Sequence, residues 1–251
     1  MPGERASRRA EPGRASITGT GASSRKRCFA FLDALLMCEY EDMSTPLTLP
    51  PIAACRKTGL ERFQAEGADA GFNLLDFWQW SVSDLVSNAT RGILAEYIVA
   101  RALGLGTGIR NEWDAFDLRT PSGLKIEVKS AAYLQSWFQK NFSPIVFVIP
   151  PTRAFDAATN VLSAVSKRQA DVYVFALLSH RDKETVDPMN LDQWEFYVVG
   201  VSALNDRQRS QHSITLKSLQ LLCPVPFRFA GLAAAISKVG GDAPVAGGAG
   251  V

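Results

Sequence analysis

The sequence predicts an α/β fold, in which a mixed sheet has helices before, between and after its strands. Apolar runs at 145–149, 172–178 and 194–201 have the length and the β-branched and aromatic content of strands. Helical segments stand around and between these runs, an order that packs helices against a sheet in layers. With 251 residues and 47% hydrophobic content, the chain can bury one good core.

Both ends of the chain differ in composition from its centre. Residues 1–42 begin with a stretch that lacks apolar periodicity, and we expect disorder there. A basic and then apolar segment at 25–38 superficially resembles a signal peptide, but acidic residues within and after it argue against one. We therefore expect Met43 to begin the functional chain, a single domain to span 43–239, and the Gly/Ala-rich tail at 240–251 to be unstructured.

The first two elements of this domain are predicted to be helices. Residues 72–84 are rich in Leu, Phe and Trp, and we assign this helix to the core in preference to a platform for bases. Residues 88–104 open with an N-cap residue, Asn88, and close with Gly104 at a C′ position.

The second of these helices carries an acid on its apolar side. At about 100° per residue, Arg91 and Arg101 fall on one side, which we expect to be exposed. Glu96 falls on the opposite side, among small and apolar residues. A buried carboxylate needs a metal, a cation or a hydrogen bond, so an ion pair with a structural arginine is the alternative to a metal site.

Residues 114–129 are predicted to form a β-hairpin. The Pro-Ser-Gly sequence at 121–123 supplies a fixed φ, a hydrogen-bonding hydroxyl and a residue that tolerates positive φ. Apolar residues alternate on both sides of this turn and should share one face. They are Phe116, Leu118, Leu124, Ile126 and Val128.

The polar face of the same hairpin gathers two acids and a lysine. Asp117 from the first run meets Glu127 and Lys129 from the second, with cross-strand Cβ atoms roughly 5 Å apart. That spacing suits two carboxylates that share a divalent cation. Asp114 is the alternative to Asp117, ranked second because its register misaligns the apolar sides. A weak surface ion pair is the structural alternative for the whole pattern.

The remaining segments complete the sheet and its helical cover. We predict helices at 156–169, 214–222 and 227–237, interleaved with the three strand-like runs. Helices before, between and after a mixed sheet give an α/β or α+β sandwich.

A helix with an inward Glu, a strand with Asp and a strand with Glu-x-Lys resemble the PD-(D/E)xK nuclease superfamily over residues 88–131. The continuation Glu-Val-Lys-Ser at 127–130 resembles restriction-endonuclease-like members of that group. The resemblance implies a restriction-endonuclease-like core, a central mixed sheet flanked by helices on both faces. One position departs from the pattern: Phe116 stands where a Pro would precede Asp117, so the choice between Asp117 and Asp114 stays open.

The resemblance also implies roles for the four charged residues. Asp117 and Glu127 would be metal ligands, and Glu96 would be an auxiliary ligand. Lys129 would position or activate the attacking water and stabilise charge on the phosphate. Hard carboxylate oxygens select Mg²⁺ or Mn²⁺ rather than zinc.

These patterns predict a metal-dependent phosphodiesterase, a Mg²⁺-dependent DNA endonuclease of restriction or repair type. The alternative is a non-catalytic member of the same fold that binds nucleic acid or a partner. A third possibility, an interaction domain with an incidental ion-pair face, requires Glu96 to be exposed. Whether the chain forms a homodimer, or works with a methyltransferase or helicase, stays open.

Charge and cysteine content limit how the protein can contact DNA, which metals it can hold and where it is expected to work. A net charge of +2 excludes a broad basic surface, so contacts to DNA should be local, with Arg91, Ser130 and Gln135 as candidates. Four cysteines without Cys-x-x-Cys spacing and two histidines argue against a structural zinc or a disulfide framework, and fit the cytoplasm. No uninterrupted run of eighteen apolar residues occurs, so we expect no membrane span.

Overall fold

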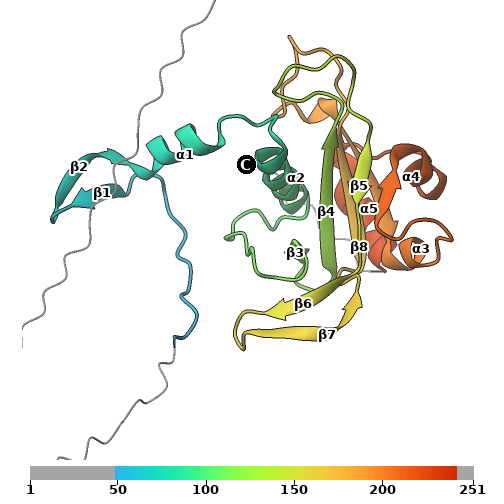
Figure 1. The fold of residues 1–251 in the computed structure, drawn as a ribbon, viewed down its shortest axis with the longest axis horizontal. Helices are drawn as coiled ribbons and strands as arrows, with labels where there is room; N and C mark the ends of the chain where they lie inside the picture. The colour runs from blue at the N-terminus through green and yellow to red at the C-terminus, as the bar shows by residue number, and fades with distance from the viewer. Residues whose placement is uncertain (1–48, 242–251) are drawn as a thin grey trace, which may run out of the picture. The chain divides into compact units, whose positions relative to one another are not determined.

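A computed structural model of the chain describes residues 49–241 (Figure 1). By its internal contacts the chain divides into residues 1–48 and residues 49–251, and the described residues all belong to the second unit. The expectations for residues 1–42, for Met43 as the start and for the tail beyond Gly241 lie outside the described residues. Of the helices in the described part of the chain, none has the length and apolar content needed to cross a membrane.

The central sheet has four strands in the order β3-β4-β8-β9. Strand β4 pairs antiparallel with β3 and parallel with β8, and β8 pairs antiparallel with β9. The expected mixed sheet is therefore confirmed. Its strands are β3 Leu118–Arg119, β4 Lys125–Ala132, β8 Val172–Leu178 and β9 Trp194–Gly200.

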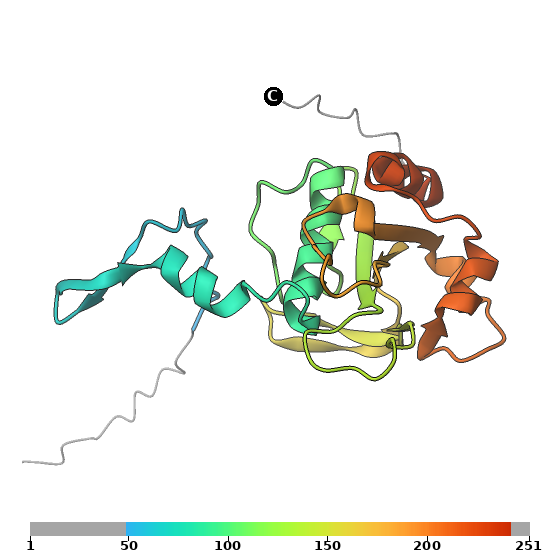
Figure 2. The ribbon, with the colours of Figure 1, turned by 90° about the horizontal axis from the view of Figure 1, so that it is seen from above.

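One face of this sheet is covered by α2 (Asn88–Ala102) and α5 (Phe229–Gly240), which lie against the strands in Figure 2. Ile126 and Val128 of β4 pack there with Val99 of α2, and all three are buried. Burial of such side chains contributes roughly 1.5–3 kcal/mol each. The face is therefore an apolar core that fixes α2 beside β4.

The opposite face is covered by a second apolar cluster. A short pair of strands, β5 (Val146–Val148) and β10 (Ser213–Thr215), packs there together with α3 (Val201–Asn205) and α4 (Leu216–Leu222). Helices thus lie on both faces of the mixed sheet, as predicted. The largest fully buried side chains of this cluster include Phe147, Phe175, Tyr197, Leu204 and Leu219.

One predicted helix, at 156–169, is wrong. Strands β6 (Thr152–Asp156) and β7 (Val161–Lys167) occupy this stretch as an antiparallel hairpin. Asn160 has φ +56°, a left-handed conformation that Asn tolerates and that ends one strand before the next begins. The other predicted helices are confirmed as α4 and α5, and the three strand-like runs as β5, β8 and β9.

A hairpin and a helix precede α2 along the chain: β1 (Arg62–Ala65), β2 (Ala68–Asn73) and α1 (Leu74–Val82). No side chain of α1 is buried, so the assignment of this helix to the core was wrong. Apolar content alone does not distinguish a core helix from an uncovered one.

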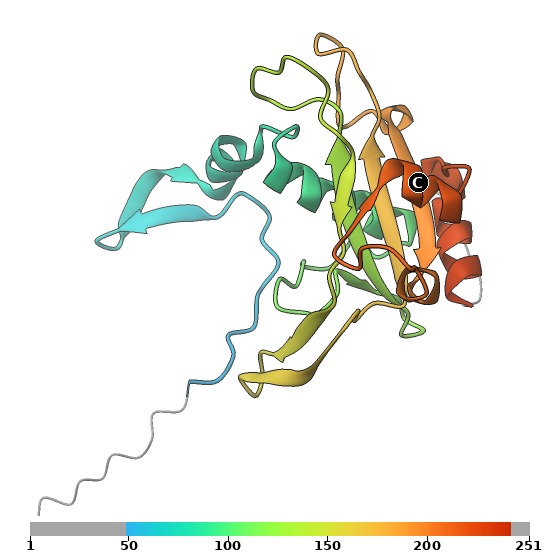
Figure 3. The same ribbon diagram turned by 45° about the vertical axis from the view of Figure 1, so that its right-hand side comes forward.

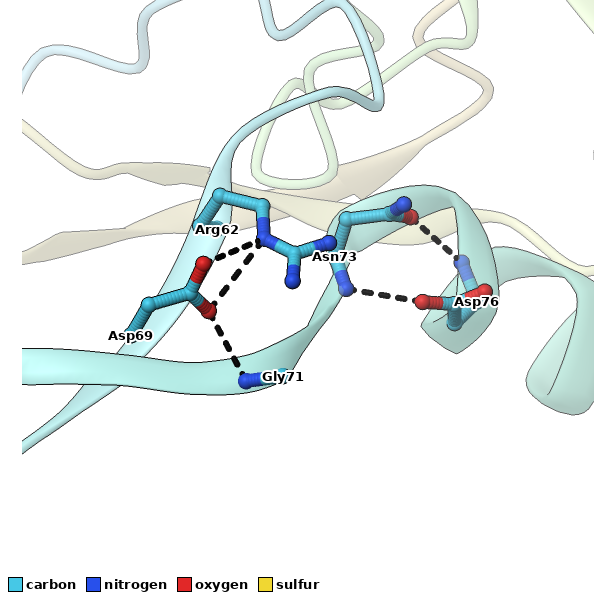
Figure 4. A network of polar contacts seen from close by, with 5 residues as sticks. All are labelled: Arg62, Asp69, Gly71, Asn73 and Asp76. Atoms are coloured by element: carbon cyan, nitrogen blue, oxygen red, sulfur yellow. Dashed lines mark hydrogen bonds and ion pairs between the residues drawn. The ribbon is translucent and has the colours of Figure 1, made fainter.

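Local polar contacts hold this segment in shape (Figure 4). The Arg62 guanidinium pairs with the Asp69 carboxylate, which also accepts from the Gly71 backbone N–H at 2.8 Å. Asn73 and Asp76 form a capping box at the start of α1, each side chain accepting from the other's backbone N–H.

Candidate active site

The site is built on the hairpin β3–β4, which forms in the predicted register. Leu118 lies opposite Ile126, and Arg119 lies opposite Lys125. Gly123 has φ +96°, and its N–H donates to the Thr120 carbonyl at 2.9 Å. The turn therefore needs the positive φ that only Gly adopts without strain.

Asp117 lies one residue before β3, where the hairpin register continues toward Glu127. Its backbone N–H donates to the Ile126 carbonyl at 3.0 Å, and its Oδ2 accepts from the Val128 N–H at 2.7 Å. The carboxylate is thus fixed against β4, whereas Asp114 is exposed. The structure brings Asp117, and not Asp114, to the strand that carries Glu127.

Phe116 corrects one detail of the predicted faces. It packs in the second apolar cluster, while Leu118 packs in the first, although we expected both on one face. The chain before Asp117 is irregular rather than extended, so the alternation of a strand does not reach residue 116.

The pKa of Asp117 is raised from 3.8 to about 7. Burial is the main cause, followed by the negative charges of Glu127 and Glu96, while the Val128 N–H and Lys129 act in the opposite direction. A carboxyl whose pKa is raised by burial and by neighbouring acids lies in a region of low dielectric close to those acids. Groups arranged in this way are typical of functional sites.

Glu127 and Lys129 project from the same face of β4. Lys129 Nζ lies 2.5 Å from Glu127 Oε1, and both side chains are partly buried. They line a cavity of about 360 Å³, together with Phe147, Gln169 and Tyr173. Burial, with Glu127 as the second cause, raises the pKa of Tyr173, so its hydroxyl stays protonated at neutral pH.

Glu96 points away from solvent, as the helix pattern predicted, with its side chain 13% exposed. It is held by Arg110 in a two-point ion pair, with Nε at 2.5 Å and Nη2 at 3.1 Å from its two oxygens. An interaction domain with an incidental ion-pair face required Glu96 to be exposed, and the side chain is not exposed. The structural-arginine alternative is realised by Arg110, yet Glu96 still acts on Asp117 electrostatically.

The three residues expected to contact DNA are tied into the protein. Arg91 is 3% exposed, so its predicted exposure was wrong. Its guanidinium donates to Val86 O and Asn88 Oδ1 at 2.6 Å each and to Ser130 Oγ at 3.3 Å, which joins the start of α2 to β4. Gln135 is also buried, and donates to Ala132 O. Arg101 is exposed, as predicted.

Arg110 and Tyr173 were missed by reasoning from the sequence. Arg110 lies in an irregular segment whose return toward α2 no periodicity reveals. Tyr173 lies opposite Glu127 because β4 and β8 pair in parallel, and the partner and register of a parallel strand are set by tertiary packing.

The donors on the hairpin fit a hard divalent cation. Within residues 49–241, no group of three or more His, Cys, Asp or Glu side chains is arranged to hold a metal ion. The pair of Asp117 and Glu127 remains, and a cation would relieve the repulsion that raises the pKa of Asp117. Mg²⁺ commonly binds through one or two carboxylates, with waters and substrate phosphate as its other ligands.

The sequence model of the family described as bacteriophage T4 endonuclease IV matches residues 47–218. The chain belongs to this family. The matched region contains α2, the β3–β4 hairpin and the strands that line the cavity. Membership in the endonuclease IV family supports a nuclease. No curated protein matches the chain.

Proposed function

We propose that this chain is a metal-dependent DNA endonuclease whose active site is the polar face of β3–β4. One observation carries the proposal: in a member of an endonuclease family, the pKa of the partly buried Asp117 is raised by desolvation and then by the charge of Glu127, beside Lys129. A structural ion pair would lower the pKa of its acid, not raise it. The arrangement is that of a site prepared for a cation.

Asp117 and Glu127 would hold the metal ion, with Glu96 as an auxiliary acid. A bound Mg²⁺ or Mn²⁺ would neutralise charge on the phosphate and lower the pKa of water. The protein's own contribution is positional, because the Val128 N–H fixes Asp117 and the strand pairing fixes Glu127. The preference for Mg²⁺ or Mn²⁺ follows from the hard carboxylate oxygens.

Lys129 stabilises the charge that develops on the phosphate. Its ammonium has three N–H donors, and the contact with Glu127 uses one of them. The other two are free to reach a phosphate oxygen or the attacking water at the cavity. A fixed cation that needs no rearrangement lowers the barrier by stabilising the transition state.

The order Glu96, Asp117, Glu127 and Lys129 supports membership of the PD-(D/E)xK superfamily and a restriction or repair role. A non-catalytic nucleic-acid-binding protein is the second candidate. The observation in its favour is Arg110, which occupies both oxygens of Glu96. The endonuclease proposal does not depend on Glu96, however. If Arg110 keeps Glu96 from the metal, Asp117 and Glu127 remain, and two carboxylates suffice for Mg²⁺.

A cleavage assay on plasmid, linear duplex, single-stranded DNA and RNA, with Mg²⁺, Mn²⁺ or EDTA, tests the proposal. We expect metal-dependent cleavage of DNA that falls about 100-fold or more in Glu127→Gln and Asp117→Asn. Asp114→Asn is the matched control and should keep its activity. If no substrate and metal give cleavage that Glu127→Gln abolishes, the binding protein is the correct assignment.

A further inference from the structure

Two loops outside the catalytic cavity form a surface of aromatic rings and cations. The first loop joins β4 to β5, and the second follows β8; both project at the same end of the sheet (Figure 3). We call this surface the aromatic platform. It consists of Tyr133, Trp137, Phe138, Lys140 and Phe142 from the first loop and Arg181 and Lys183 from the second.

The rings of the platform face solvent. Trp137, Phe138 and Phe142 are 53%, 84% and 51% exposed. Large apolar side chains that gather on a surface in this way mark a binding site. The Arg181 guanidinium lies 4.3 Å from the Tyr133 ring centroid and 5.7 Å from that of Phe142, so the cation is stacked among the rings.

Hydrogen bonds fix the backbone of the loop that carries these rings. The Gln135 backbone N–H donates to Gln139 Oε1 at 2.7 Å, and Gln139 Nε2 donates to the Tyr133 carbonyl at 3.1 Å. Ser143 closes the loop with a backbone bond to Tyr133 O at 3.0 Å. Lys183 Nζ donates to the Trp137 carbonyl at 2.6 Å and joins the two loops. The exposed rings are therefore carried by loops whose backbone is fixed by hydrogen bonds.

The platform includes three cations, and the exposed acids Asp182 and Glu184 stand beside two of them in the second loop. Within residues 49–241, neither Arg181, Lys140 nor Lys183 forms an ion pair with an acid. The adjacent Asp182 is turned into its own loop, where it accepts from Thr185 Oγ1 at 2.7 Å and from a backbone N–H. The guanidinium edge of Arg181 donates no hydrogen bond to the described protein, so its N–H groups can meet an anion.

A cavity of about 330 Å³ lies beside these cations, lined by residues that include Leu134, Phe142 and Arg181. Its volume is within the range of small-molecule sites and is large enough for a nucleobase. An exposed aromatic face beside unpaired cations is the combination that stacks a base and holds its phosphate. A partner protein with an acidic and apolar surface is the other possible occupant, and membership of an endonuclease family favours DNA.

The platform is covalently continuous with the catalytic strand. Tyr133 follows Lys129 by four steps along β4 and its extension, about 13 Å at the rise of a strand. That distance corresponds to roughly four nucleotides at the 3.4 Å spacing of one DNA strand. A substrate at the cavity would therefore reach the platform within a few nucleotides of the bond that is cut.

We propose that the aromatic platform binds an unpaired nucleobase of the DNA substrate and its phosphate, a few nucleotides from the scissile bond. The identity of the ligand as DNA rests on the proposed endonuclease function. Trp137 and Phe138 present faces for stacking, and Arg181 and Lys140 hold the phosphate. Bases inside a duplex are already stacked on their neighbours, so a base must be unpaired or flipped out to bind.

Fluorescence anisotropy of the full chain with labelled decathymidylate in EDTA tests the platform without cleavage. A decamer of abasic sites with the same phosphates separates stacking from charge. We expect Trp137→Ala and Phe138→Ala each to weaken decathymidylate binding about 5- to 100-fold and to leave abasic binding unchanged. Arg181→Ala should weaken the binding of both oligomers. Arg181→Lys should restore binding of the abasic oligomer more than binding of decathymidylate.

Trp80→Ala and Lys238→Ala are the matched controls, an exposed ring and a cation outside the platform, and should bind as wild type does. The proposal would be overturned if Trp137→Ala and Phe138→Ala lost affinity equally for the two oligomers. It would also be overturned if both variants bound decathymidylate as tightly as wild type does. Absence of any oligonucleotide binding by wild type would also overturn it and point to a protein partner.

Glu127→Gln separates this proposal from the endonuclease assignment. If Glu127→Gln abolishes cleavage while Trp137→Ala binds and cleaves as wild type does, only the platform is wrong. If Glu127→Gln leaves cleavage unchanged while Trp137→Ala loses binding, the active-site assignment is wrong and the platform stands.

Discussion

The carboxyl of Asp117 is a group in the site whose ionisation the fold opposes. Its pKa is raised from 3.8 to about 7, so the folded state binds this proton more tightly than the unfolded state. The resulting stability is complete below about pH 4 and is lost as the pH rises toward 7 and above. Without divalent ions, the unfolding free energy of wild type should therefore fall between about pH 4 and pH 8.

Urea unfolding in EDTA at pH 5, 6, 7 and 8 checks this dependence. Asp117→Asn cannot ionise, so its profile should be flatter than that of wild type and its stability higher at pH 8. Parallel profiles for the two proteins would show that Asp117 does not carry the raised pKa.

Glu96 and Arg110 form a pair whose role can be separated by a double-mutant cycle. Glu96→Gln and Arg110→Ala should each lower the unfolding free energy by about 1 kcal/mol, since the pair is only partly buried. If the pair acts as one unit, the double variant should lose less than the sum of the single losses. Additive losses in thermal or urea unfolding would contradict a direct coupling.

At the scale of elements, the β3–β4 turn depends on the positive φ of Gly123. Gly123→Ala should lower the unfolding free energy by about 1–2 kcal/mol, because an L-residue is strained at φ +96°. Gly92→Ala is the matched control: Gly92 lies within α2, where an added Cβ meets open space, and the change should stabilise by about 0.5–1 kcal/mol. Equal effects of the two variants in urea unfolding would contradict the turn assignment.

Elements with strong local patterns could be predicted from the sequence. The hairpin, α2 and the apolar strands β8 and β9 follow from turn residues, caps and alternation, which act over a few residues. The β6–β7 hairpin was missed because its strands are mostly exposed and lack a continuous apolar run, and the turn at Asn160 has a weak signal. The exposure of α1 was missed because burial depends on what covers a helix, not on its composition.

The candidate site was predicted in part for the same reason. Asp117, Glu127 and Lys129 meet within one hairpin, so strand alternation alone brings them together. Arg110 and Tyr173 join them only through tertiary packing. Arg91 was placed on the wrong side because its hydrogen bonds to Val86 and Ser130 draw it into the junction with β4, which a helical projection does not contain.

In the molecule as a whole, the two faces of the sheet differ in role: one packs against α2 and α5, and the other carries residues of the candidate site. The face under α2 and α5 is mainly apolar, and the opposite face carries Glu127 and Lys129 beside the cavity. A ligand that binds only the folded site stabilises the entire unit. Mg²⁺ at 100 times its Kd should therefore raise the unfolding free energy of wild type by about 2.7 kcal/mol at pH 8.

Thermal unfolding with increasing Mg²⁺ measures this linkage. Glu127→Gln should show little stabilisation, because it keeps the shape of the side chain and removes the charge that the cation requires. Asp114→Asn should respond as wild type does. A shift of the same size in Glu127→Gln would place the metal elsewhere in the chain.

The single-turnover rate of DNA cleavage in Lys129→Ala, set against Lys125→Ala, tests the central claim most directly. Both lysines lie on β4, but only Lys129 contacts Glu127 at the cavity. We predict that Lys129→Ala slows cleavage about 100-fold or more and that Lys125→Ala cleaves at nearly the wild-type rate. Equal rates for Lys129→Ala and wild type would contradict the assignment of the β3–β4 hairpin as the active site.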